Sequence, residues 1–400
     1  MGKETGIVER SQRDILYSLN NFDKLLLQCA RIDLSQKNYQ AISDILAGGK
    51  IDWDSLLEKA SLQRLAPLVA HHLMSPELNA TVPTHILEKM RTIRYRSLAR
   101  NILLQNELSH LLPIFYREGI PVIVLKGAAL LQSLYKDISL RPMLDLDILV
   151  KPEHLDRAEA LALNQGYVQV VNEKTHDEAK NSWHQLPYLV HREKKIVLEI
   201  HQHLVDSDYP CRFDMKGFWD RALPLKMYGD CALTFTPEDM LIHLSIKFLL
   251  DRRYHSDNAL GQLCDISEII QHHCDSLNWD LLFKIAEESS IKSGIYFIFL
   301  TCQQLLDTPV PETVLRKYQP LDFSPHMAEL FIRRRVLDSR PWLAHGLTDP
   351  RIPYGRLKLL KAIYGRFIAL TRNAFKKNEL DTIPRTYYRK RIRDILLKLL

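Results

Sequence analysis

The chain has 400 residues, more than one hydrophobic core usually holds, and this length predicts two or three packed subdomains. Hydrophobic residues make up 46% of the sequence and charged residues 26%, a composition that excludes a disordered chain. The formal net charge of +6 is unevenly distributed: residues 351–400 hold fourteen Lys and Arg against three acidic residues, so the preceding 350 residues carry about −5.

The first region, residues 1–118, is predicted to be helical. Apolar residues recur there at helical spacing, and the last long helix is expected to stop at Gly119. Glycine is scarce, at 14 of 400 residues against a typical share of about 7%, which also favours helices over a sheet-rich fold with many tight turns. The clearest helical patterns span residues 15–26, 53–73 and 102–116.

The second region, residues 119–236, has the pattern of a small mixed α/β sheet domain. Short apolar runs rich in β-branched residues predict strands, and runs with helical spacing lie between them. The predicted strands span residues 121–125, 144–150, 167–171, 188–191 and 196–201. The predicted helices span residues 128–135 and 152–165.

From residue 237 the chain becomes helical again, and we predict a C-terminal helical domain over residues 237–320. The predicted fold class is therefore α+β, with a small mixed-sheet core embedded between N-terminal and C-terminal helical regions. Prolines at positions 309, 311, 320 and 325 indicate a linker. Residues 321–400 are predicted to be linker followed by a basic helical tail.

Two interpretations of this basic tail remain open. Basic residues between Arg385 and Arg393 are interleaved with Tyr387 and Tyr388, a pattern that suits contact with a nucleic-acid backbone. The apolar residues nearby instead indicate an amphipathic helix that packs on the acidic body of the protein. Those apolar residues are Ile392, Ile395, Leu396 and Leu399.

The cysteines and the apolar stretches indicate the compartment. Six cysteines are scattered without the paired spacing of a zinc site or a disulfide framework, which is typical of a reducing environment. The first thirty residues hold no apolar segment behind a basic start, and polar residues interrupt the most apolar helical stretches. We therefore expect a cytoplasmic protein that does not engage a membrane.

Asp145 and Asp147 lie in a predicted strand in which acidic and aliphatic residues alternate. Side chains two apart on a strand point to the same face, so both carboxylates project together while Leu146 and Ile148 face the buried side. Two adjacent carboxylates repel each other, and burying them without a cation is costly. Oxygen ligands of this kind suit Mg²⁺ or Mn²⁺ shared with substrate phosphates.

A third carboxylate, Glu199, lies in a later acid-bearing strand, with His201 on the same face. Three carboxylates on adjacent strands can hold two metal ions, one to activate an attacking oxygen and one to stabilise a leaving pyrophosphate. We therefore predict Asp145, Asp147 and Glu199 as metal ligands and catalytic residues. His201 is predicted to be a ligand or the neighbour of one.

The turn Lys126-Gly127 closes the strand before these acids and opens a helix. Backbone N–H groups at a helix N-terminus bind phosphate well, and Lys126 would add a positive charge. Gly127 would let the backbone approach the phosphates. Arg141 lies four residues before Asp145, within reach of a triphosphate or of the carboxylates. We predict Lys126, Gly127 and Arg141 as nucleotide-binding residues.

This succession of motifs resembles the nucleotidyltransferase superfamily, also called DNA polymerase β-like. More narrowly, it looks like a bacterial group of nucleotidyltransferase family proteins. The resemblance is strong over residues 120–205 and looser in the flanks. Gly127 is followed by Ala128 where the superfamily usually has Ser or Gly, and Glu199 stands where many relatives carry Asp. The residues that carry the resemblance are Leu125-Lys126-Gly127-Ala128, Tyr135, Arg141, Asp145-Leu146-Asp147, Leu198-Glu199-Ile200-His201 and, in the flanks, Trp53-Asp54, Pro237-Glu238-Asp239, His243 and Asp265.

The resemblance implies transfer of a nucleoside monophosphate from a nucleoside triphosphate such as ATP to a hydroxyl or phosphate of an acceptor, with Mg²⁺ or Mn²⁺. It leaves the acceptor open. One alternative is tailoring of a peptide natural product, by nucleotidyl transfer or by glycosyl transfer from a nucleotide sugar. Another is a toxin-like enzyme that modifies tRNA. A non-enzymatic alternative is a nucleotide-binding module with a spent site.

Overall fold

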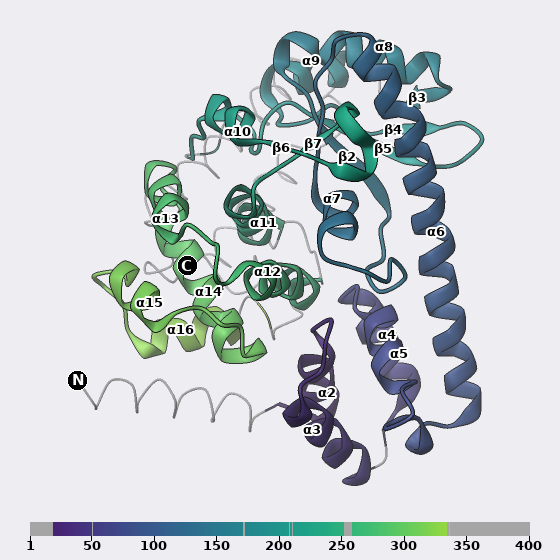
Figure 1. Cartoon of the computed structure of the whole chain (residues 1–400), viewed down its shortest axis with the longest axis vertical. Helices are drawn as coiled ribbons and strands as arrows, with labels where there is room; N and C mark the ends of the chain where they lie inside the picture. The colour runs from purple at the N-terminus through teal and green to yellow at the C-terminus, as the bar shows by residue number, and fades with distance from the viewer. Residues whose placement is uncertain are drawn as a thin grey trace, which may run out of the picture.

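The computed structural model describes residues 19–49, 51–170, 173–207, 209, 211–251, 258–333 and 336. A seven-stranded mixed sheet lies between two groups of helices, which confirms the predicted α+β class. In Figure 1 the sheet lies in the upper part, the first helices lie below it, and the last helices lie to one side. Buried apolar side chains form one connected cluster that extends from Leu25 to Val336. The division of the chain into four regions stays a prediction.

The long helix α6 (Thr84–Arg117) links the N-terminal helices to the sheet. It packs against α5 near one end and against α8 near the other, along one side of the molecule (Figure 1). The sequence predicted only its second half, because buried positions in the first half are few and some, such as Ser97, are polar. The helices before it are α2 (Asn21–Cys29), α3 (Gln36–Ala47), α4 (Trp53–Leu62), α5 (Ala66–Leu73) and the short 3-10 helix η1 (Asn79–Thr81).

The single helix predicted over residues 53–73 is wrong, because the structure has two helices there, α4 and α5, joined by a tight turn. Pro67 fits the break, since it has no N–H to donate to a preceding turn of helix and is tolerated where it stands, in the first turn of α5. Arg64, in the turn, has a φ of +56°, in the left-handed region.

The sheet has the strand order β3-β4-β5-β2-β1-β7-β6. The five predicted strands are present, each shorter than predicted, and two very short strands at one edge were not predicted. The central pair, β2 and β5, is parallel, whereas β1 pairs with β2 in the antiparallel direction. The strands are β1 (Ile123–Val124), β2 (Asp145–Leu149), β3 (Tyr167–Gln169), β4 (Leu189–His191), β5 (Val197–His201), β6 (Leu223–Pro224) and β7 (Leu233–Thr234).

Helices surround the sheet and continue to the end of the described chain. Three of them, α9, α10 and the 3-10 helix η3, were not predicted. Around the sheet lie α7 (Lys126–Ser133), η2 (Pro152–His154), α8 (Leu155–Asn164), α9 (Glu173–Ser182), α10 (Met215–Arg221) and η3 (Lys226–Cys231). The C-terminal helices are α11 (Pro237–Asp251), α12 (Ala259–His273), α13 (Trp279–Glu288), α14 (Lys292–Leu306), α15 (Glu312–Tyr318) and α16 (Pro325–Ile332).

The prediction of a linker from the prolines at positions 309 to 325 is wrong. The segment expected to be linker contains α15 and leads into α16, because Pro311 precedes α15 directly and Pro325 is the first residue of α16. Proline is tolerated in the first turn of a helix, where its missing N–H has no intrahelical partner. The basic tail, residues 351–400, lies outside the described residues. Of the helices within the described ranges, none combines the length and the apolarity that crossing a membrane requires.

Asn101, a fully buried residue of α6, holds the loop that leads into β2. Its side-chain amide donates to the carbonyl oxygens of Ile138, at 2.5 Å, and Arg141, at 2.9 Å. Its amide oxygen accepts from the backbone N–H of Met143 at 3.1 Å. The three bonds satisfy buried backbone groups that no strand or helix would pair, and they set where β2 begins.

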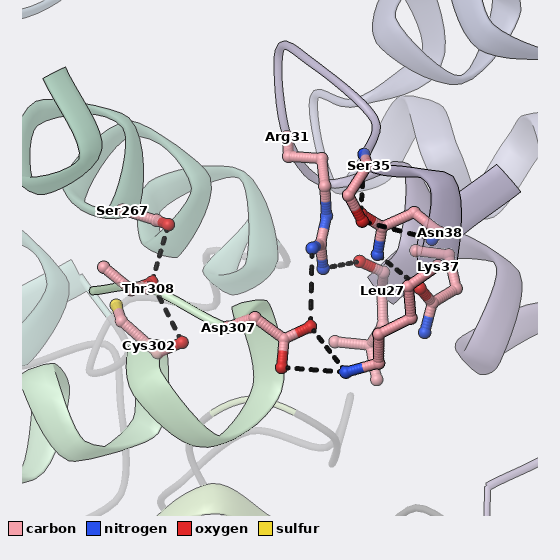
Figure 2. Close-up of polar contacts among 10 residues, drawn as sticks. Leu27, Arg31, Ser35, Lys37, Asn38, Ser267, Cys302, Asp307 and Thr308 are labelled. Atoms are coloured by element: carbon pink, nitrogen blue, oxygen red, sulfur yellow. Dashed lines mark hydrogen bonds and ion pairs between the residues drawn. The ribbon is translucent and has the colours of Figure 1, made fainter. Parts of the chain in front are cut away.

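The N-terminal and C-terminal helices meet around Asp307, the residue that ends α14 (Figure 2). Its carboxylate lies 3.6 Å from the Arg31 guanidinium and 3.3 Å from the Lys37 ammonium. Next to it, the Thr308 hydroxyl contacts the Ser267 hydroxyl of α12 at 2.7 Å. Polar contacts therefore join α3 and the segment before it to the C-terminal end of α14, which in turn contacts α12.

Glu268 of α12 makes a second contact between the two groups of helices, and this contact is sensitive to pH. Its carboxylate accepts from the Ile32 N–H at 2.8 Å, and burial raises its pKa from 4.5 to about 7. The folded protein therefore holds a proton that the unfolded chain releases between these values, so stability falls as pH rises from about 4.5 to 7. We expect Glu268→Gln to exceed the wild type in free energy of unfolding by roughly 1–3 kcal/mol above pH 7 and to match it near pH 4.5.

Denaturant unfolding at a series of pH values measures this difference. Glu268→Ala is the control, because it leaves the Ile32 N–H without its acceptor and should lie below Glu268→Gln at every pH. A constant difference between wild type and Glu268→Gln across the series would show that the folded carboxyl ionises as it does in the unfolded chain.

Candidate functional site

The register of the two central strands places three acidic side chains on one face of the sheet. Asp147 of β2 pairs with Glu199 of β5, and Asp145 pairs with Val197. Residues paired in this way on parallel strands point to the same side, as do residues two apart on one strand. The carboxylates of Asp145, Asp147 and Glu199 therefore face one side, together with His201. The intervening residues, such as Leu146 and Leu198, are fully buried on the other side.

Lys126 lies in the middle of the acidic cluster. Its ammonium nitrogen is 2.5 Å from Asp147 Oδ1 and 3.7 Å from Glu199 Oε2. It is the first residue of α7 and has a φ of +46°, a conformation that costs a residue with a side chain about 1–2 kcal/mol. Burial alone would lower the pKa of Lys126, but Asp147 and Glu199 outweigh burial and raise it. The lysine is thus a permanent cation held against the two acids.

His201 contacts the same two carboxylates from the end of β5. Its Nε2 lies 3.0 Å from Asp147 Oδ1 and 3.6 Å from Glu199 Oε2. Its ring packs against the ring of His184, whose Nδ1 is 2.6 Å from Asp206 Oδ1. Within the described part of the chain, Asp147, Glu199 and His201 each offer one ligand atom, and these atoms lie within 4.8 Å of one another. Such a group can hold a metal ion.

The three carboxylates differ in how well they are neutralised. Burial would raise the pKa of Asp147, but Lys126 and His201 hold it well below its usual value. Burial likewise opposes ionisation of Glu199, whose pKa is nevertheless lowered, chiefly by its hydrogen bond with His201. Asp145 is the exception: burial first, and then the charges of Asp147 and Glu199, raise its pKa. Lys126 and His201 therefore favour the ionised forms of Asp147 and Glu199, whereas Lys126 does not offset the burial and repulsion that raise the pKa of Asp145.

Arg141 reaches the same place but is engaged with another residue. Its guanidinium donates three hydrogen bonds to the Asp265 carboxylate of α12, at 2.7 to 3.1 Å. The Tyr135 hydroxyl donates to the same carboxylate at 2.9 Å. The contact ties the loop before β2 to the C-terminal helices. A direct role of Arg141 in nucleotide binding stays a prediction.

Gly127 has a packing reason to be glycine. A Cβ at this position would lie 2.6 Å from an Arg141 guanidinium nitrogen and 3.0 Å from the Met143 side chain. The absent side chain lets Arg141 and Met143 lie directly against the first turn of α7. Its proposed role in the approach of phosphates stays a prediction, and a larger residue here would first displace Arg141.

These residues line one pocket of about 260 Å³. The sheet and α7 supply the three acids, Lys126 and Gly127, the loop before β2 supplies Arg141, and the C-terminal helices supply Lys247 and Asp265. The turn between α4 and α5 contributes Arg64. Arg64 and Lys247 were not predicted as site residues, because neither belongs to a motif, and Asp265 was noted only for the looser resemblance in the flanks.

The part of the chain that builds this pocket is also the part that matches a known protein family. The profile of a family described as uncharacterised nucleotidyltransferase matches residues 49–307, well over half of the chain. The matched segment contains the sheet, α7 and the helices on both sides that line the pocket. No curated protein and no solved structure matches the chain significantly.

The unequal neutralisation of the acids predicts opposite effects of the same substitution. Asp147→Asn removes the carboxylate that pairs with the buried Lys126 ammonium, so we expect the free energy of unfolding to fall by roughly 3–5 kcal/mol. Asp145→Asn removes like-charge repulsion, so we expect stability equal to or above that of the wild type. Denaturant unfolding near neutral pH measures both. Equal losses in the two variants would show that Asp145 is neutralised as well as Asp147.

Proposed function

The chain belongs to the uncharacterised nucleotidyltransferase family, and we propose that it transfers a nucleoside monophosphate from a nucleoside triphosphate to a hydroxyl or phosphate of an acceptor. The observation that carries this proposal is the set of three acids on one face of two parallel strands, beside the lysine that opens α7. We propose Asp145, Asp147 and Glu199 as the catalytic residues, in line with the DNA polymerase β-like arrangement that the sequence resembles.

The donor set fits a divalent cation. The carboxylates of Asp147 and Glu199 converge with the His201 imidazole nitrogen, Asp145 projects from the same face of β2, and carboxylate oxygens are the ligands that Mg²⁺ and Mn²⁺ prefer. Burial first, and then the charges of Asp147 and Glu199, raise the pKa of Asp145, and a bound cation would offset both effects. Asp145, Asp147 and Glu199 would hold the ion, with His201 as a further ligand or as the group that orients Asp147. When bound, the ion would supply Lewis-acid chemistry, offsetting the charge of the phosphates and of the attacking oxygen.

The residues of the chain would orient the phosphates and accept the proton. The N-terminus of α7 has no side-chain cap, so its first backbone N–H groups remain available to a phosphate at the pocket. Lys126 would turn from Asp147 toward the phosphates once a divalent cation neutralises the acids. The acceptor oxygen forms a bond to the α-phosphorus, the bond from that phosphorus to the bridging oxygen breaks, and pyrophosphate leaves. The proton of the acceptor passes to a carboxylate of the cluster.

The experiment supplies the purified chain with Mg²⁺ and each nucleoside triphosphate, labelled either at the α- or at the γ-phosphate, in the presence of cell extract. We expect the α-label to become attached to an acceptor and the γ-label to leave as pyrophosphate. Asp145→Asn and Glu199→Gln should reduce the transfer more than about a hundredfold, beyond the usual cost of a change next to a metal ligand. Glu153→Gln, at an exposed position in η2, should not reduce it.

Chelation of divalent ions should stop the transfer in the same assay. Attachment of the γ-label would indicate phosphoryl transfer and contradict the proposal. Attachment of sugar from a labelled nucleotide sugar, without attachment of the α-label, would establish glycosyl transfer instead. Mass analysis of the labelled acceptor would separate a peptide from tRNA.

A further inference from the structure

Arg64 reaches the pocket from outside the sheet. It lies in the turn between α4 and α5, far in sequence from the acids, yet it lines the same pocket as Asp145, Asp147 and Glu199. Its side chain is exposed. The pocket is therefore completed by an arginine from the N-terminal helices.

The turn that carries Arg64 is held firmly. The Leu65 N–H donates to the Ala60 carbonyl at 2.8 Å, which closes the end of α4. The Gln63 side-chain oxygen accepts from the Leu260 N–H of α12 at 2.8 Å. A Cβ on Gly261 would lie 2.3 Å from the Gln63 carbonyl oxygen, so only glycine lets α12 start directly against this turn. The position of Arg64 therefore depends on contacts between segments about two hundred residues apart in sequence.

The backbone at Arg64 is one that arginine rarely adopts. Its φ of +56° lies in the left-handed region, which favours glycine or asparagine. Strained residues of this kind concentrate at functional sites, where surrounding contacts enforce them. Lys126, another cation that lines the pocket, also has a positive φ. The backbone conformation favours glycine, so we infer that the arginine side chain has a function at this position.

Other cations of the pocket are already engaged. Lys126 pairs with Asp147, and Arg141 donates three hydrogen bonds to the Asp265 carboxylate. The guanidinium of Arg64, by contrast, forms no hydrogen bond or ion pair with any residue that the structure describes. It is close enough to lower the pKa of Asp145 in part, against the larger effect of burial. Because Arg64 lines the pocket, its charge is available to an anion there.

We propose that Arg64 binds the phosphate chain of the donor nucleotide. A guanidinium offers two parallel N–H groups to phosphate oxygens, and such charge-assisted bonds are stronger than neutral ones. Arg64 would hold the phosphates against the N-terminus of α7 from the side opposite the sheet. This inference rests on the proposed function, since it assigns the group that recognises the triphosphate of that reaction.

The test uses Arg64→Gly and Arg64→Lys in the full chain, with Arg91→Ala, an exposed arginine of α6, as the matched control. Equilibrium binding of ATP, GTP, CTP and UTP is measured by calorimetry with Mg²⁺, and the triphosphate that the wild type prefers is then compared with its monophosphate. We expect Arg64→Gly to weaken triphosphate binding about tenfold to a hundredfold. Binding of the monophosphate should change much less, Arg64→Lys should recover part of the affinity, and Arg91→Ala should match the wild type.

Thermal unfolding of Arg64→Gly distinguishes this role from a structural one. Glycine relieves the left-handed strain, so the variant should unfold at the same or a higher temperature while it loses affinity. Unchanged triphosphate binding in Arg64→Gly, with a wild type that binds, would overturn the role of Arg64 and leave the proposed function standing. A lower unfolding temperature with equal losses of triphosphate and monophosphate would also overturn it, as a structural effect. Failure of the wild type to bind any of the four triphosphates would overturn the proposed function and this inference together.

Discussion

Buried negative charge is the constraint around which this pocket is built. Asp145, Asp147 and Glu199 lie on two neighbouring strands, and Asp147 is almost fully buried. Carboxylates packed in this way repel one another and lose their hydration, so the folded state requires positive charge beside them. Lys126 supplies it beside Asp147 and Glu199, and His201 contacts Asp147, while Asp145 keeps a raised pKa. Metal binding would follow from this remaining imbalance.

The basic side chains of the pocket come from segments outside the sheet. Lys126 is the first residue of α7 and itself has a left-handed backbone conformation. Arg141 is held in place by Asp265 of α12. Asn101 of α6 fixes the loop between α7 and β2, which contains Arg141. The helical regions on either side are thus part of the pocket, which accounts for a family match that extends well beyond the strands.

The sequence predicted what local periodicity encodes and missed what tertiary contacts decide. Alternation of acidic and aliphatic residues identified β2 and β5, because one face of each strand is apolar and fully buried. The helical pattern of residues 53–73 predicted one helix across Pro67, whereas the turn before this proline is what places Arg64 in the pocket. The partner of Arg141 was not predictable, since Asp265 lies 124 residues away and no local pattern links the two. The roles of the predicted site residues remain predictions that the geometry supports.

The most direct test of the account is the affinity of the acidic cluster for Mn²⁺, measured from the electron paramagnetic resonance signal of the free ion. The account predicts that the wild type binds Mn²⁺ and that Glu199→Gln binds it more weakly. It also predicts that Lys126→Met binds it more tightly, because the ammonium 2.5 Å from Asp147 Oδ1 competes with a metal ion for the same carboxylate. Equal or weaker binding by Lys126→Met, or no binding by the wild type, would contradict the claim that these acids form a metal site.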